Sequence, residues 1–75
     1  GQEAYGMKRL TKRQKEIVKR IASGQTMKEI ALEDGLSRKT IEYHWDLARK
    51  RIGLHDVALV TQWALKHGLI QFTVK

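Results

Sequence analysis

The chain has 75 residues, a length that allows one small domain with a single core. Hydrophobic residues make up 41% of it, enough for a globular core, and the lack of cysteine excludes disulfides and thiolate metal sites. Lysine and arginine exceed aspartate and glutamate by 15 to 8, and the net charge of +7 favours a polyanionic partner, either nucleic acid or an anionic membrane surface. No apolar run is long enough to span a membrane, and no signal peptide is recognisable.

Residues 1–8 are mixed and aperiodic, and we interpret them as a linker or a cloning remnant. A first helix is predicted over residues 12–23, with Thr11 as its N-cap and Gly24 as its stop. Its apolar stripe consists of Ile17, Val18, Ile21 and Ala22.

A second helix is predicted over residues 27–34. It follows Thr26, which forms a capping-box pattern with Glu29, and Gly35 supplies the turn after it. Met27, Ile30 and Ala31 are assigned to its inner face.

A third helix is predicted over residues 38–52, capped by Ser37 and ended by Gly53. Its core-facing stripe is Ile41, Trp45, Ala48 and Ile52. Together with the preceding short helix and glycine turn, it has the pattern of a helix-turn-helix, whose second helix enters the DNA major groove.

A fourth helix is predicted over residues 57–67, capped by Asp56, and Gly68 stops it so that Leu69 and Ile70 can fold back on the core. The chain lacks proline and any period-two run that would favour a sheet. We therefore predict an all-α fold, a compact four-helix domain over residues 9–70 with a C-terminal tail over 71–75.

Five blocks of residues, in order and at matching spacing, resemble the LuxR-type (GerE-like) helix-turn-helix domain of bacterial transcription regulators. They are Leu10, Thr11, Arg13 and Glu16; Gly24, Lys28, Glu29, Ile30 and Ala31; Ser37, Thr40, Ile41 and His44; Arg51, Ile52, Gly53 and Leu54; and Ala64, Gly68, Leu69 and Ile70.

This resemblance implies that residues 38–52 recognise double-stranded DNA and that residues 57–67 form the contact of a homodimer. It also implies a cytoplasmic bacterial regulator whose larger form carries an N-terminal receiver or sensor domain. RNA polymerase is a further candidate partner, and no membrane is expected as one. We interpret the chain as an excised output domain, and the alternative is a free-standing regulator of this length.

Candidate base contacts lie on the exposed side of the predicted recognition helix: Lys39, Glu42, Tyr43 and Asp46. A carboxylate can accept a hydrogen bond from cytosine N4, and the Tyr43 ring can meet a thymine methyl group or remain a partly packed surface aromatic. The family commonly has lysine where Glu42 stands. The alternative for both carboxylates is pairing within the helix, Glu42 with Arg38 and Asp46 with Lys50.

Candidate phosphate contacts combine helix N-termini with basic side chains: Thr26, Lys28, Ser37, Arg38, Thr40, Arg49 and Lys50. Lys39 is also expected, like Arg49, to contribute one phosphate contact to the salt dependence of binding. Candidate dimer contacts are Val57, Leu59, Val60 and Trp63, and burial in the core is the alternative for each of them.

Asp34 stands where the family usually has leucine, and we expect Leu32 or Leu36 to fill that part of the core. The resemblance implies a structural role for His44 at the helix-turn-helix, and His55 and His67 are isolated, so we expect no metal site and no cofactor. No nucleophile motif or phosphate-binding glycine loop is present, so an enzyme is not predicted. Two alternatives to a LuxR-type regulator remain: a promoter-binding module like sigma-factor region 4, and a protein-interaction module that has lost affinity for DNA.

Overall fold

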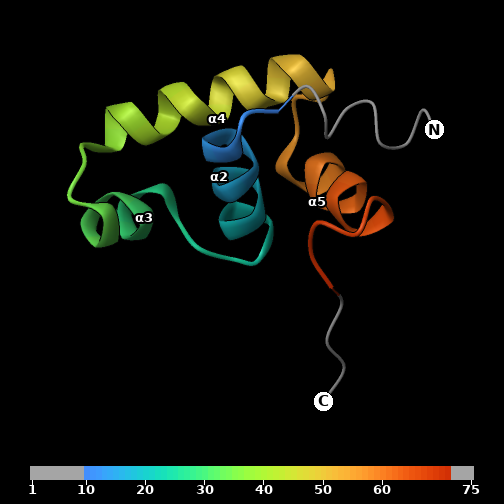
Figure 1. The fold of residues 1–75 in the computed structure, drawn as a ribbon, viewed down its shortest axis with the longest axis horizontal. Coiled ribbons are helices and arrows are strands. Elements are labelled where there is room, and N and C mark those ends of the chain that lie inside the picture. Colours follow the sequence, from blue (N-terminus) through green and yellow to red (C-terminus); the bar gives the residue numbers. More distant parts are fainter. Residues whose placement is uncertain (1–9, 72–75) are drawn as a thin grey trace.

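The computed structural model describes residues 10–71, a stretch with four helices and no strands (Figure 1). The helices are α2 (Lys12–Ala22), α3 (Met27–Asp34), α4 (Arg38–Ile52) and α5 (Val57–Lys66). The predicted all-α class is confirmed, and only the first and last helices end one residue earlier than predicted. The expected linker over residues 1–8 and all but the first residue of the predicted tail lie outside the described residues.

Each helix begins directly after the residue predicted to cap it. At α3 the Thr26 hydroxyl accepts the backbone N–H of Glu29 (3.1 Å), and the Glu29 carboxylate accepts the backbone N–H of Thr26 (3.0 Å). These reciprocal bonds satisfy two donors that the first turn would otherwise leave unpaired. Side-chain oxygens cap the other three helices at Thr11, Ser37 and Asp56.

The turn between α3 and α4 depends on Gly35, whose φ of 67° lies in the left-handed region that disfavours other residues. The Leu36 N–H donates to the carbonyl of Ala31 at 2.9 Å across this turn. The turn is therefore tight, and only Gly35 and Leu36 separate the end of α3 from Ser37, the N-cap of α4.

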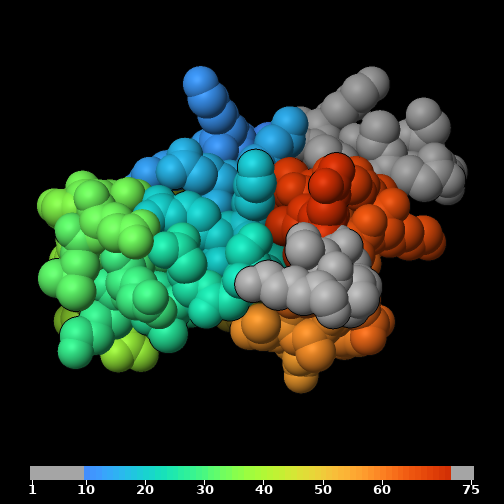
Figure 2. All heavy atoms as spheres, turned by 90° about the horizontal axis from the view of Figure 1, so that it is seen from below, coloured from blue at the N-terminus to red at the C-terminus, as the bar shows by residue number. Residues whose placement is uncertain are grey.

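The core contains most residues of the predicted apolar stripes, whereas Ala22, Met27 and Ile52 are only partly buried beside it. Its buried apolar members are Leu10, Ile17, Val18, Ile21, Ile30, Ala31, Ile41, Trp45, Ala48, Val60 and Ala64. Helix α2 packs against both α4 and α5, and α3 packs against α4 (Figure 1). Seen from the side opposite α4, the surface shows α3 and α5 on either side of the α2–α3 turn (Figure 2). Among the described helices, none has both the length and the apolar character needed to cross a bilayer.

The expectation that Leu32 or Leu36 fills the core is wrong. The Leu32 side chain points to solvent with 74% of its surface exposed, and Leu36 is also exposed. Asp34 itself occupies the position next to α2, where its carboxylate meets two arginines and needs no apolar substitute.

Candidate nucleic-acid interface

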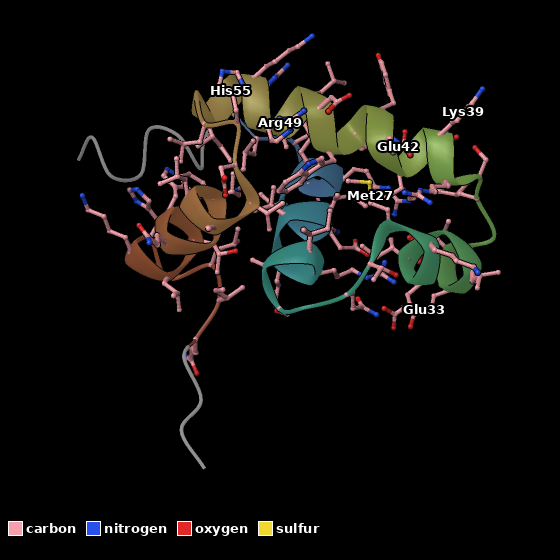
Figure 3. The ribbon with its side chains drawn as sticks, turned by 180° about the vertical axis from the view of Figure 1, so that it is seen from behind. Met27, Glu33, Lys39, Glu42, Arg49 and His55 are labelled. Atoms are coloured by element: carbon pink, nitrogen blue, oxygen red, sulfur yellow. The ribbon has the colours of Figure 1, made fainter. Side chains whose placement is uncertain are left out.

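One side of α4 is open to solvent along its whole length because the opposite side carries the buried stripe of Ile41, Trp45 and Ala48. The exposed side chains along this open face are those of Lys39, Tyr43, Asp46 and Lys50. An α-helix with its side chains is about 10–12 Å across, so the fifteen-residue α4 can enter a DNA major groove about 12 Å wide. Figure 3 shows Lys39 projecting outward near the start of α4, with Glu42 further along and Arg49 toward the other end.

Tyr43 is exposed on the open face of α4. Its side chain is 60% exposed, and its ring lies edge-on to His44 with 5.7 Å between the ring centroids. His44 is partly buried, so it limits the Tyr43 ring on one side. An aromatic side chain held in this way offers an apolar edge and a hydroxyl at low cost in conformational entropy.

Glu42 forms the predicted ion pair within α4. Its Oε1 lies 3.1 Å from Nε of Arg38, one turn earlier, and both side chains are largely exposed. Exposed pairs of this kind contribute only about 0.3–0.5 kcal/mol. Arg38 can therefore exchange Glu42 for a phosphate oxygen at little cost, and the exchange would leave the carboxylate unpaired.

Asp46 pairs with Arg49 and not with Lys50, so the expected partner is wrong. The Arg49 guanidinium also donates to the carbonyl of His55 at 2.9 Å, and it lies over the Trp45 ring with 5.9 Å from Cζ to the centroid. Its side chain is only 25% exposed, and its Nε is buried without a hydrogen-bond partner. Arg49 thus ties α4 to the α4–α5 turn, whereas a phosphate contact would have to displace some of these bonds.

The two helix N-termini differ in how well they suit a phosphate. At α3 the Glu29 carboxylate occupies the Thr26 N–H, and this hydrogen bond holds the pKa of Glu29 below its usual value. At α4 the first turn contains no acidic residue and carries Arg38 and Lys39. Since helix N-termini attract anions, the α4 end suits a phosphate better than the α3 end.

The remaining candidate phosphate contacts vary in how freely they can reach DNA. Ser37 and Thr40 share a hydroxyl–hydroxyl bond of 2.9 Å while Ser37 also caps the Thr40 N–H at 3.1 Å. Exposed ammonium groups with no ion pair to a described residue belong to Lys28, Lys39 and Lys50.

The four candidate dimer residues do not share one environment. Val57 and Leu59 are each 47% exposed at the start of α5. Trp63 is partly buried against the core, and the centroid of its ring lies 4.8 Å from that of the His67 ring. Val60 is fully buried inside the single chain, so it cannot contact a second copy directly, and the core alternative holds for it.

Sequence reasoning missed a group of ionic contacts between α2 and α3. The Arg20 guanidinium contacts both Asp34 oxygens at 3.0 Å and also pairs with Glu33, while its Nε donates to Gln25 at 2.9 Å. Arg13 adds a second arginine to Asp34 at 3.1 Å. The one signal in the sequence was Asp34, which stands where the family usually has leucine.

Comparisons with known proteins agree with this architecture. The family described as "Bacterial regulatory proteins, luxR family" matches residues 8–64. The chain is 42% identical over 60 residues to the uncharacterized response regulatory protein YgeK of Escherichia coli K12, covering 80% of this chain and 41% of that protein. It is 41% identical over 51 residues to the transcriptional regulatory protein UhpA of the same organism, covering 67% of this chain and 26% of UhpA.

A third relative is the transcriptional regulatory protein MctR of Rhizobium johnstonii, 34% identical over 61 residues, with 81% of this chain and 28% of MctR covered. The chain thus spans less than half the length of each of these relatives. No solved structure gives a significant match. The match to residues 8–64, a range that contains α2, α3, α4 and most of α5, shows that the chain belongs to the luxR family of bacterial regulatory proteins.

Proposed function

We propose that this domain binds double-stranded DNA sequence-specifically as the cytoplasmic output domain of a bacterial transcription regulator, with α4 in the major groove. The observation that carries the proposal is the open face of α4. It presents the exposed Lys39, Tyr43 and Lys50 on a helix whose other side is locked into the core. The net charge of +7 and membership of the luxR family support the same function.

In this proposal the role of each α4 side chain depends on whether it already forms an ion pair within the protein. Lys39 and Lys50 approach phosphates, Tyr43 approaches a base edge, and the weakly held Arg38 releases Glu42 toward a cytosine N4 group. Asp46 keeps its pairing with Arg49 in the complex.

We further propose that two copies bind a two-fold symmetric site through the exposed part of α5 formed by Val57, Leu59 and the outer part of Trp63. We also propose that a receiver or sensor domain in the full-length protein controls this contact, and the relative YgeK is named a response regulatory protein. RNA polymerase is a proposed further partner at promoters.

The test is selection of bound sites from random duplex DNA at about 0.15 M salt, where exposed charges are screened beyond about 8 Å. Enrichment of a two-fold symmetric motif is the expected result, with cytosine preferred at the position that Glu42 faces. A single unsymmetric half-site would refute the dimer. If no motif is enriched and binding disappears as salt rises, the domain acts only as a polycation or binds a protein, and the proposal fails.

A further inference from the structure

Ion pairs and hydrogen bonds attach α3 to α2. The contacts come from five residues, here called the α2–α3 ion cluster: Arg13, Arg20, Gln25, Glu33 and Asp34. The backbone of α3 packs against α4 and has few close approaches to that of α2. The side chains of the α2–α3 ion cluster therefore connect α2 to the side of α3 that faces away from α4. Figure 3 shows Glu33 on the side of α3 away from α4 and Met27 on the side toward α4.

Helix α3 needs such a connection. It has only eight residues, and helices of this length are not stable without tertiary contacts. Its apolar anchors are Ile30 and Ala31, which are buried, whereas Leu32 and Leu36 at its C-terminal end face solvent. The end of α3 that leads into the turn before α4 is therefore fixed by the ionic contacts of Glu33 and Asp34.

Arg20 is the centre of the cluster. Its Nε reaches Gln25 in the α2–α3 turn, while its two amino groups reach Asp34 and Glu33 on α3. Its side chain is 17% exposed and that of Asp34 is 20% exposed, so water and salt screen this contact less than a surface pair. Lysine cannot reproduce it because a single ammonium lacks the planar fork that contacts three partners at once.

We propose that Arg20 and Asp34 are positioning residues for DNA recognition, which hold the C-terminal end of α3 so that α4 starts at the orientation DNA requires. This inference rests on the proposed function, because α4 is taken as the recognition helix. Neither residue contacts DNA in this scheme. Both act through α3, the Gly35 turn and the cap of α4.

Whether Asp34→Asn strengthens or weakens DNA binding distinguishes a purely electrostatic role of Asp34 from a positioning role. Asp34→Asn raises the formal net charge from +7 to +8, and electrostatics alone would therefore strengthen DNA binding. Positioning predicts the opposite, a weakening. Glu16→Gln changes the charge by the same amount at an exposed carboxylate 3.4 Å from the same arginine and leaves the contact with Asp34 intact, so it is the matched control.

The experiment compares the wild-type domain with Asp34→Asn, Arg20→Lys and Glu16→Gln. Affinity for a selected duplex is measured at fixed salt, and amide hydrogen exchange is measured without DNA, with circular dichroism confirming that each variant is folded. Asp34→Asn and Arg20→Lys should each lose about tenfold in affinity, and the amides of α3 should lose about tenfold in protection while those of α2 and α5 keep theirs. Glu16→Gln should bind as well as the wild type or slightly better.

Three results would overturn the inference: stronger binding by Asp34→Asn, unchanged affinity with unchanged α3 exchange, or an equal loss of protection in all helices. If the wild-type domain binds no duplex at all, the proposed function fails. In that case the exchange data alone decide whether the ion cluster fixes α3, since they require no DNA. Loss of protection confined to α3 would support this attachment, and unchanged protection would refute it.

Discussion

The sequence predicts that Lys39 and Arg49 both contact phosphates, but in the structure the two side chains differ in how many groups of the protein they contact. The Lys39 ammonium is exposed and has no ion pair to a described residue, whereas Arg49 contacts Asp46, the His55 carbonyl and the Trp45 ring. We therefore expect alanine at these two positions to have effects of different kinds.

For Lys39→Ala the expected effect is on the salt dependence of DNA binding. Loss of one phosphate contact changes the slope of log K against log salt by about 0.9. The ratio of wild-type to variant affinity should then shrink about 3.5-fold between about 50 and about 200 mM salt. Fluorescence anisotropy with a labelled duplex measures both quantities.

For Arg49→Ala the expected effect is on stability. The variant loses a charged hydrogen bond to the His55 carbonyl, a cation–π contact with Trp45 and an exposed ion pair with Asp46. Allowing for partial exposure, these losses lower the free energy of unfolding by about 1–3 kcal/mol. The salt slope should stay unchanged in this variant.

Lys66→Ala in the last turn of α5 removes the same charge from a different helix and controls for the general loss of positive charge. The reasoning is refuted if Arg49→Ala reduces the salt slope by about 0.9 while urea unfolding shows unchanged stability. Arg49 would then be a phosphate ligand, as the sequence alone suggested.

Three further predictions concern specificity, acid and the core. Tyr43→Ala should reduce base discrimination by about 1–3 kcal/mol at one position of the site, and an unchanged preference profile after repeated site selection would contradict this. Asp34 and Glu29 accept hydrogen bonds that hold their pKa values below the ordinary 3.8 and 4.5, so the unfolded chain takes up protons first on acidification. The urea midpoint should therefore be steady above about pH 5 and fall below about pH 4, and a midpoint independent of pH down to pH 3 would exclude this linkage. Ile41→Ala, at a fully buried position, should cost about 2–5 kcal/mol in urea unfolding, whereas Leu32→Ala should cost less than about 0.5 kcal/mol because its side chain is exposed; equal costs would contradict the assigned core.

The features that could be predicted from the sequence are those set by local spacing. Thr26 and Glu29 stand three residues apart, and their capping box forms because one helical turn brings them together. The stripe of Ile41, Trp45, Ala48 and Ile52 is likewise a consequence of helical period; the first three are buried as predicted, and Ile52 is partly buried against the core.

The features that could not be predicted depend on where separate helices meet. Arg20 and Asp34 are 14 residues apart, and no periodic pattern links them until α2 and α3 are placed in space. By spacing, Asp46 could pair with Arg49 three positions later or with Lys50 four positions later. The structure selects Arg49, whose guanidinium also donates to the His55 carbonyl beyond the end of α4. Leu32 stands two positions before Asp34, about 200° around the helix, so it faces away from α2 and is exposed once Asp34 is placed toward α2.

The placement of the two tryptophans gives this domain a pair of intrinsic optical reporters. Trp45 is buried in the core on α4, so its emission should shift to longer wavelength only when the fold opens. Trp63 is partly exposed on α5 beside the His67 ring, and its emission should respond to events at that surface while the core stays intact. Single-tryptophan variants with phenylalanine at the other position would therefore separate unfolding from self-association without any attached dye.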